Sequence, residues 1–232
     1  MEVIALIIAG GIGSRMGQAI PKQFLTVYDK PIIAYTMEKF ENHPAIDAIA
    51  VVCLDGWEHI LESYAKQYKI TKLKHIFPAG AVGQESIKNG IMGLAKFYDD
   101  DAIVLIHDAI RPNLSKDIIS DCIDMTKQYG NAIVCIPCQE AMLETKDKIC
   151  SESSYPRDNL KRTQTPQGFK LGIIKNAHIK AAELGITNSI ASCTLMIEVG
   201  EKVFFSMGSE KNIKLTTLED MEIFKALLDG SK

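Results

Sequence analysis

Short runs of β-branched and aliphatic residues alternate with longer helical patterns through more than half of the chain. The strand-like runs are Val3 to Ile8, Ile49 to Cys53, His75 to Phe77, Ile103 to Ile106 and Ala132 to Ile136. The helical patterns between them are Ile32 to Phe40, Trp57 to Gln67, Ser86 to Phe97 and Lys116 to Gln128. This alternation predicts an α/β fold in which helices cover both faces of a mostly parallel sheet. Ligands of such sheets bind at the carboxyl ends of the strands.

The alternation ends at a polar segment that runs from Pro137 to Gln167. This segment contains three prolines and shows only weak two-residue alternation, around Met142 to Ile149. Long structureless loops are uncommon in compact domains, so the composition predicts a β-arm that projects from the globular body. Such an arm needs a partner surface, which favours a homodimer formed through it.

Regular patterns resume after the arm. They predict a helix at Leu171 to Glu183, a strand at Lys202 to Ser206 and a helix at about Leu218 to Leu228. No repeat or linker divides the chain, so we expect residues 1–232 to form a single domain.

Composition narrows the class of ligand. The 232 residues carry a net charge of −3 and 47% hydrophobic residues, so nothing in the bulk charge attracts nucleic acid or an anionic membrane. No run is long enough to span a membrane, and the first residues lack the features of a signal peptide. We therefore expect a cytoplasmic protein whose ligands are small and whose six cysteines are reduced.

A glycine-rich loop, Ala9-Gly10-Gly11-Ile12-Gly13-Ser14-Arg15, follows the first buried strand. Glycines there can bring several backbone N–H groups toward one anion, and the cations Arg15 and Lys22 can fold over a polyphosphate. The loop is not a P-loop and lacks the third glycine of the dinucleotide fingerprint. A tight turn at the sheet edge is the alternative, and the two cations favour the phosphate site over it.

The loop and the following Pro21-Lys22-Gln23-Phe24 resemble the signature of the cytidylyltransferases that act on methylerythritol phosphate and ribitol phosphate. Further matches extend over nearly the whole chain: Lys30-Pro31-Ile32, Ser86, His107-Asp108-Ala109-x-Arg111-Pro112, Thr165-Pro166-Gln167-x-Phe169 and Asn212-Ile213-Lys214. The resemblance implies a nucleotidyltransferase (Rossmann-like) sheet, a homodimer paired through the β-arm, and the transfer of a cytidylyl group from CTP to a polyol phosphate. It also implies Mg²⁺ as cofactor.

By this resemblance, the CTP triphosphate and cytosine are bound by Ala9, Gly10, Gly11, Gly13, Gly80 and Ser86. Arg15, Lys22 and Lys214 are the implied catalytic cations, because the acceptor phosphate is already ionised and the reaction requires positive charge more than a base. Asp108 is implied to hold magnesium or the nucleotide ribose. Arg111 and Arg157 are implied to bind the acceptor phosphate, with Arg157 supplied by the partner subunit.

Alternatives remain for several of these residues. Asp108 can instead cap a turn or pair with Arg111, and His107 is interpreted as structural. The pair Cys135 and Cys138 has the spacing of a redox or zinc site, and it is the only support for a rival function as a non-catalytic nucleotide-binding or redox protein. The run Asp99 to Asp101 is interpreted as a solvated turn.

The acceptor side departs from the family pattern. Ala141 stands where a threonine is usual, and Ile190-Ala191 stand where a Thr-Asp or Ser-Asp pair is usual. The loss of a hydroxyl and a carboxylate is expected to change which acceptor is used, because a site built for such a contact discriminates against its absence. The glycine loop is closer to the ribitol phosphate branch, so we predict ribitol 5-phosphate as acceptor and CDP-ribitol as product. The alternative acceptor is 2-C-methyl-D-erythritol 4-phosphate, of isoprenoid precursor synthesis.

Overall fold

The computed structural model describes residues 1–11 and 20–230. Its centre is a seven-stranded sheet with the strand order β11-β7-β10-β6-β1-β4-β5. The strands are β1 (Val3–Ala9), β4 (Ala48–Cys53), β5 (Leu73–Pro78), β6 (Ile103–Asp108), β7 (Asn131–Pro137), β10 (Lys161–Lys170) and β11 (Phe205–Met207). All neighbouring pairs are parallel except those that β10 makes with β6 and β7. The expected α/β fold with a mostly parallel sheet is confirmed.

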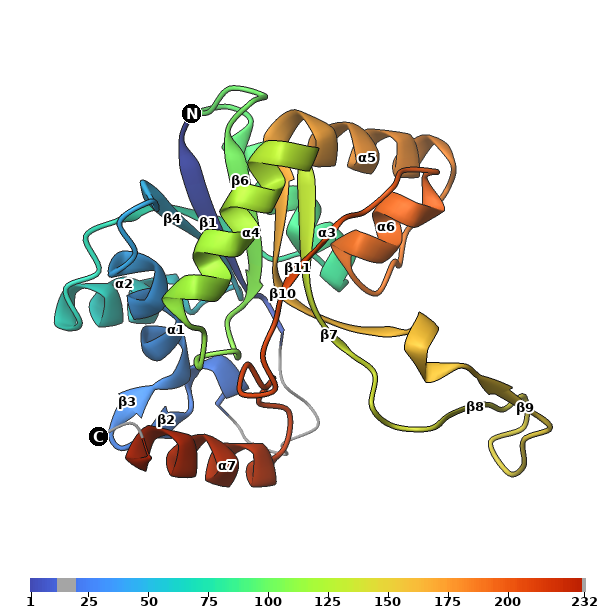
Figure 1. Ribbon diagram of the computed structural model, residues 1–232. Coiled ribbons are helices and arrows are strands. Elements are labelled where there is room, and N and C mark those ends of the chain that lie inside the picture. The colour runs from blue at the N-terminus through green and yellow to red at the C-terminus, as the bar shows by residue number, and fades with distance from the viewer. Residues whose placement is uncertain (12–19, 231–232) are drawn as a thin grey trace.

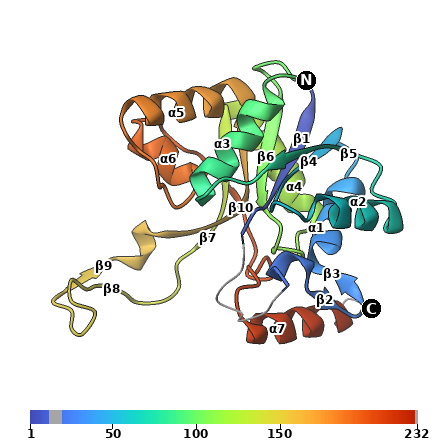
Figure 2. The same ribbon diagram turned by 180° about the vertical axis from the view of Figure 1, so that it is seen from behind.

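Helices cover both faces of the sheet (Figures 1 and 2). One face carries α1 (Ile32–Glu41), α2 (Glu58–Gln67) and α4 (Lys116–Tyr129), and the other carries α3 (Gly83–Leu94), α5 (Leu171–Glu183) and α6 (Ser192–Glu198). Strand β1 shows how the sequence produces this layering. Its side chains alternate between the two cores, with Ala5 and Ile7 on one side and Ile4 and Leu6 on the other. The sheet is therefore apolar on both faces.

Local signals fix where the elements end. The Ser115 hydroxyl accepts the backbone N–H of Ile118 and caps α4, while Gly130, with φ of 84°, ends the same helix in the left-handed conformation. The last helix, α7 (Leu218–Asp229), is capped in the same way by Thr217 and packs on a small separate core that includes Leu215 and Phe224. This core holds the chain that precedes α7 against the sheet edge.

The arm is shorter than the sequence predicted. A two-stranded ribbon, β8 (Met142–Glu144) and β9 (Ser153–Tyr155), projects from the body (Figure 1). Residues 161–167 form the first part of β10. Residues 161–163 are exposed and pair with the end of β7, whereas Gln164 and Gln167 are buried in the sheet. The strand was not predicted because this stretch is polar. Its buried amide side chains are stabilised by hydrogen bonds, which leave no hydrophobic pattern in the sequence.

Two further differences concern the last third of the chain. The strand predicted at Lys202 to Ser206 is observed at Phe205–Met207, so it begins later and is short. The seven-residue helix α6 has no counterpart in the prediction, because two turns give too few residues for a clear helical period. Among the described residues, no helix combines the length and apolar character needed to cross a membrane.

Candidate active site

The carboxyl ends of β1, β4 and β6 meet at one edge of the sheet because these strands run parallel. A cavity of about 370 Å³ lies there, between the end of β1, the segment that joins β5 to α3, and the chain that precedes α7. Seven residues of the predicted site line it: Gly10, Gly11, Lys22, Gly80, Ser86, Asp108 and Lys214. The fold thus gathers residues from four separate parts of the sequence at the expected edge.

Two glycines of this first cavity stand where a side chain does not fit. A Cβ added to Gly10 would lie 2.6 Å from the Cβ of Ala79, and one added to Gly80 would lie 2.4 Å from the Cγ of Glu85. The Ser86 hydroxyl accepts the backbone N–H of Gly80 at 2.9 Å and holds this segment on the N-terminal turn of α3. The end of β1 and the segment before α3 therefore pack closely and present backbone rather than side chains to the cavity.

Lys22 reaches the cavity from a segment that Gln23 anchors. The Gln23 side chain is buried, and its Nε2 donates to the carbonyl oxygens of Ala9 at 2.7 Å and Gly11 at 3.0 Å. Gln23 was not predicted as a site residue, although it stands in the quoted Pro21-Lys22-Gln23-Phe24 motif. Its bonds return the chain to the end of β1 and fix the position of Lys22.

Two of the predicted phosphate-binding residues, Gly13 and Arg15, lie outside the described residues. Their roles stay predictions.

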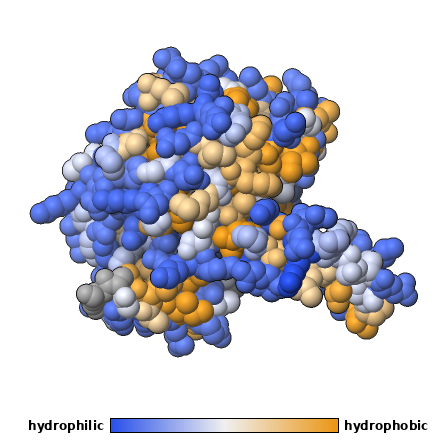
Figure 3. All heavy atoms as spheres, in the orientation of Figure 1, coloured by the Kyte–Doolittle hydropathy of each residue, from blue (hydrophilic) through white to orange (hydrophobic). Residues whose placement is uncertain are grey.

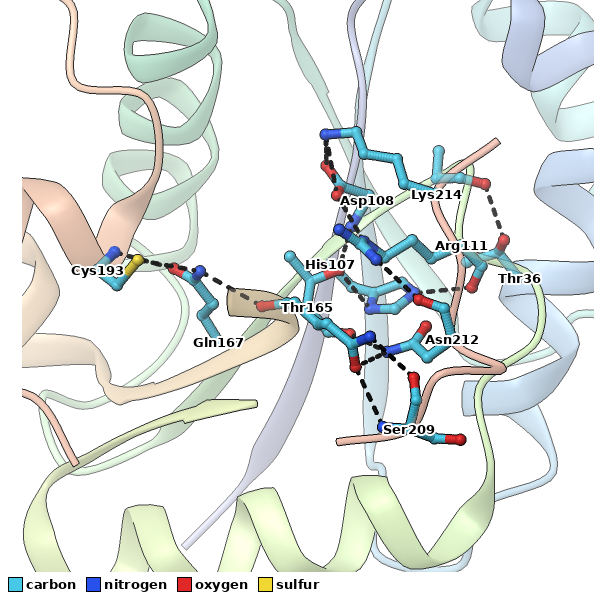
Figure 4. Close-up of polar contacts among 12 residues, drawn as sticks. Thr36, His107, Asp108, Arg111, Thr165, Gln167, Cys193, Ser209, Asn212 and Lys214 are labelled. Carbon is cyan, nitrogen blue, oxygen red and sulfur yellow. Dashed lines mark hydrogen bonds and ion pairs between the residues drawn. The ribbon is translucent and has the colours of Figure 1, made fainter. Parts of the chain in front are cut away.

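Asp108, the last residue of β6, lies between two cations (Figure 4). Its Oδ2 is 3.1 Å from Nζ of Lys214 and 3.0 Å from Nε of Arg111. Burial acts to raise the pKa of the Asp108 carboxyl, but the charges of Lys214 and Arg111 outweigh burial and the pKa lies below its ordinary value. The carboxylate is thus charged at neutral pH. Pairing with Arg111 and a place in the cavity are not alternatives, because Asp108 does both.

His107 supports the backbone beside Asp108. Its Nε2 donates to the carbonyl oxygen of Arg111 at 3.1 Å, and its Nδ1 accepts the hydroxyl of Thr165 at 3.0 Å. The same Thr165 oxygen accepts the backbone N–H of Asp108 at 3.1 Å. Burial lowers the pKa of His107 to about 4, so the ring is neutral at pH 7, as one donor and one acceptor nitrogen require. Its position agrees with a structural role.

The loop that carries Lys214 is tied to the same centre (Figure 4). The Asn212 side chain donates to the carbonyl oxygen of Thr165 at 2.8 Å, and Nη1 of Arg111 donates to the carbonyl oxygen of Asn212 at 2.8 Å. Thr165 and Asn212 were not predicted as site residues, although both stand in quoted motifs. Their presence in these motifs was the signal that could have identified them. The geometry shows that they act indirectly, by positioning Asp108 and Lys214.

A second cavity, of about 310 Å³, adjoins the first. Four residues line both cavities: Ile8, Gly83, Asp108 and Lys214. The other walls of the second cavity come from the segment after β6, from β10 and from the chain that enters α6. They include Arg111, Thr165, Gln167, Ile190, Ala191 and Ser192. Lys214 and Asp108 therefore stand at the junction of two adjacent spaces.

Ser192 brings an unsatisfied hydroxyl to the second cavity. The residue is 3% exposed, and its Oγ has no hydrogen-bond partner among the described residues. The neighbouring Cys193 N–H donates to Oε1 of Gln167 at 2.9 Å, which fixes the first turn of α6 against β10. Buried hydroxyls are normally bonded, so Ser192 has a hydrogen-bonding capacity that a ligand can use.

Arg157 lies away from both cavities of its own chain. It belongs to the short helix η3 (Arg157–Asn159) on the arm, and its guanidinium donates to the carbonyl oxygen of Gln139 at 2.9 Å. Its side chain is 61% exposed. Ala141 is also exposed on the arm. The role of Arg157 in a partner's site stays a prediction.

The other candidate sites find no support in the described part of the chain. All six cysteines are free, and burial raises the pKa of Cys135, which makes its thiol less reactive. Asp100 is paired with Lys175. No group of three or more His, Cys, Asp or Glu side chains among the described residues could hold a metal ion. Within the described ranges, Asp108 is the single carboxylate that lines the first cavity.

Comparison with known proteins identifies the family. The model of the IspD family, described as 2-C-methyl-D-erythritol 4-phosphate cytidylyltransferase, matches residues 3–230. The chain belongs to the IspD cytidylyltransferase family. Its curated relatives include the ribitol-5-phosphate cytidylyltransferases of Lacticaseibacillus paracasei, 39% identical over 97% of both chains, and of Vibrio parahaemolyticus, 40% identical over 97% of this chain and 95% of the relative.

Members named for the other acceptor are also similar. The 2-C-methyl-D-erythritol 4-phosphate cytidylyltransferase of Clostridium botulinum is 36% identical over 97% of this chain and 96% of the relative. Among solved structures, the enzyme of that name from Francisella tularensis superposes with a TM-score of 0.77 at 27% identity, over 97% of this chain and 99% of that one. The IspD family therefore includes both acceptor types at comparable similarity, with the higher identities on the ribitol side.

Proposed function

We propose that this protein transfers a cytidylyl group from CTP to ribitol 5-phosphate and releases pyrophosphate, with CDP-ribitol as product. The first cavity, of about 370 Å³, binds the nucleotide and is called the nucleotide cavity below. The second, of about 310 Å³, binds the polyol phosphate and is called the acceptor cavity. The observation that carries the proposal is their junction at Lys214 and Asp108, since transfer requires two substrates that meet at one charged point.

The chemistry follows from this junction. An oxygen of the acceptor phosphate, already ionised near neutral pH, attacks the α-phosphorus of CTP, and the bond from that phosphorus to the pyrophosphate oxygen breaks. No activated nucleophile is needed. Lys22 and Lys214 hold positive charge beside the crowded oxygens, and Arg15 is proposed to add a third cation from the glycine loop. Thr165 and Asn212 keep Asp108 and Lys214 in place.

We propose that magnesium takes part, because one carboxylate beside a triphosphate matches the preference of Mg²⁺ for one or two carboxylates, substrate phosphates and water. Asp108 is the residue that would hold it. When bound, the ion would supply further positive charge to the phosphate oxygens. Arg111 and Lys214, which pair with Asp108, lie beside the carboxylate that would hold the ion.

We propose further that the arm forms a homodimer. Four of its side chains are exposed and apolar or aromatic: Met142, Leu143, Ile149 and Tyr155, with Ile149 90% exposed. Figure 3 shows this hydrophobic colour at the tip of the arm. Exposed apolar groups on a projecting ribbon gain stability when a partner covers them. A dimer of this kind would carry Arg157 to the neighbour's acceptor cavity.

The experiment that tests the proposed function measures pyrophosphate release by the purified protein with CTP and each of two acceptors at equal concentration. A higher kcat/KM with ribitol 5-phosphate than with 2-C-methyl-D-erythritol 4-phosphate is expected. The reverse order would establish the second candidate, which the family model and the Clostridium botulinum relative favour. Release with neither acceptor would reject both. Replacing CTP by ATP is the control for the nucleotide.

A further inference from the structure

A third cavity, of about 310 Å³, lies between α3 and α5, on the face of the sheet seen in Figure 2. Among the residues that the structure describes, its lining shares none with the acceptor cavity, and Val82 alone also lines the nucleotide cavity. Its volume corresponds to that of about ten water molecules in the liquid, which suits a small organic molecule. We call it the α3–α5 cavity. No step of the proposed reaction uses it.

His178 on α5 lines this cavity and lacks partners. The residue is 2% exposed, and neither ring nitrogen has a hydrogen-bond partner among the described residues. Burial lowers the pKa of His178 to about 4, so the ring is neutral at pH 7 and offers one donor and one acceptor. A buried imidazole with both nitrogens unsatisfied is costly. Neighbouring atoms cover both nitrogens, so a ligand that enters the cavity and displaces this cover would relieve that cost.

The remaining walls define the chemistry of a ligand. Lys88 on α3 lines the cavity and forms no ion pair with any described residue, so it can receive an anion. Glu85 also lines it, with its carboxylate directed to the backbone N–H of Ala81 at 2.7 Å. Lys88 attracts a negatively charged ligand, and the Glu85 carboxylate repels additional negative charge. The cavity therefore favours a ligand with one negative charge over a ligand with two. The aliphatic side chains of Val82 and Ile186 provide an apolar wall.

The cavity is connected to both substrate cavities through short segments of chain. Val82 precedes α3 beside Gly80 and faces the nucleotide cavity as well. Gln84 donates to the carbonyl oxygen of Ile186 at 2.7 Å and accepts the backbone N–H of Ser189 at 2.7 Å, so it fixes the loop that ends at Ile190 in the acceptor cavity. A molecule that displaces Val82 therefore moves the segment that contacts the nucleotide.

We propose that the α3–α5 cavity is an effector site for a small carboxylate with a short apolar chain, and that its occupation changes the affinity for the nucleotide. The carboxylate pairs with Lys88 and bonds the His178 N–H, and the apolar chain lies against Val82 and Ile186. The effect on nucleotide affinity rests on the proposed function, whereas binding in the cavity does not. By linkage, CTP changes the affinity for the carboxylate by the same factor.

The test uses the full chain with ¹⁵N-labelled histidine and follows the ring nitrogens of His178 by NMR during a titration with butyrate. A ligand this small is expected to bind with a Kd on the order of 1 mM. Butyramide, which has the same shape without the charge, and sodium chloride are the matched controls. The His178→Gln variant assigns the signals. The CTP affinity is then measured with and without saturating butyrate, and a change of about threefold or more is expected, at the scale of allosteric coupling.

Two variants separate the site from general charge effects. Lys88→Gln removes the cation of the cavity, and Lys96→Gln removes an exposed lysine beyond the end of α3. A saturable His178 shift that Lys88→Gln abolishes and Lys96→Gln retains supports the proposal.

No saturable shift means that water alone satisfies His178 and overturns the site. An equal response to butyramide overturns the carboxylate, and an unchanged CTP affinity overturns the effector role. A protein that binds no CTP contradicts the proposed function, while the His178 titration still decides the cavity.

Discussion

The nucleotide cavity and the acceptor cavity share Lys214 and Asp108 but are built from different materials. Two walls of the nucleotide cavity contain glycines that cannot be replaced by larger residues without overlap. A Cβ at Gly10 or Gly80 would overlap a neighbouring side chain. The acceptor cavity is walled by side chains from β10 and α6, including the unsatisfied hydroxyl of Ser192. Backbone walls tolerate little sequence change, whereas side-chain walls can be exchanged one residue at a time. The second cavity is therefore where acceptor choice can vary within one family.

The largest effect is expected at the residue that the two cavities share. Lys214→Ala should lower kcat by about 10²- to 10³-fold with either acceptor, because it removes a preorganised cation at the point of transfer. Lys211→Ala, an exposed lysine on the same loop, is the control and should stay near wild type. Steady-state kinetics with ribitol 5-phosphate decides this. A loss confined to one substrate's KM would place Lys214 in one cavity only.

A comparably large effect is expected on the acceptor side from a residue of the neighbouring chain. Arg157→Ala and Lys22→Ala should each lose activity by roughly 10²-fold. If Arg157 acts across a two-fold interface, mixed dimers contain one intact site, and an equal mixture should recover about a quarter of the wild-type rate. Activity is measured after subunit exchange has been verified by mass. Exchange without recovery would show that Arg157 does not act in the partner's site.

A smaller effect tests the backbone wall of the nucleotide cavity. Gly10→Ala should lower Tm and weaken CTP binding by about tenfold, because the new methyl group overlaps Ala79 and overpacking costs about 1–3 kcal/mol. Gly11→Ala is the matched control, since its added Cβ meets no atom of the described residues within 4 Å, and its Tm should not change. Thermal unfolding and CTP titration of both variants provide the comparison. Equal losses of Tm would mean that close packing at Gly10 is unimportant.

The smallest effect is expected from one side chain of the acceptor cavity. Ser192→Ala should raise KM for ribitol 5-phosphate by about two- to tenfold, the value of one hydrogen bond, and leave KM for CTP unchanged. Ser206→Ala on β11 removes a hydroxyl of similar burial that lines neither cavity. A parallel rise in both variants would assign the effect to loss of packing rather than to acceptor binding.

The same contrast explains what could be predicted from the sequence. The stretch from the end of β1 to Lys22 is one contiguous pattern, a buried strand, then glycines, then a cation, so the residues themselves predicted a phosphate site there. Gly80, Ser86 and Lys214 were predicted from the family resemblance, and the fold places them at the same cavity. The roles of Thr165 and Asn212 were not, because they act through hydrogen bonds between β10 and a loop more than forty residues away, as in the 2.8 Å bond between them. The spacing of residues along the sequence does not predict a contact between two such distant segments.

The position of β10 escaped prediction for a related reason. The segment from Lys161 to Gln167 reads as polar. Its first three residues are exposed, and the burial of residues 164–167 depends on partners that only the fold supplies. Gln164, for example, is buried because its amide donates to the carbonyl oxygen of Ser209 at 2.8 Å. Hydrophobic periodicity detects strands that are stabilised by apolar contacts. It does not detect strands whose buried polar side chains are stabilised by hydrogen bonds.

Strand β10 also determines the order in which the molecule can be assembled. It is the sole link in the sheet between the block β5-β4-β1-β6 and the pair β7-β11. During synthesis from the N-terminus, β6 and β7 emerge before β10, and β11 emerges after it. Strands β6 and β7 therefore each keep an open edge until the chain has passed Lys170. The closing contacts are non-local and therefore slow to form. The acceptor cavity takes Thr165 from β10, Ser192 from the start of α6 and Lys214 from the chain before α7, so its lining is complete only after the last strand of the sheet has been made.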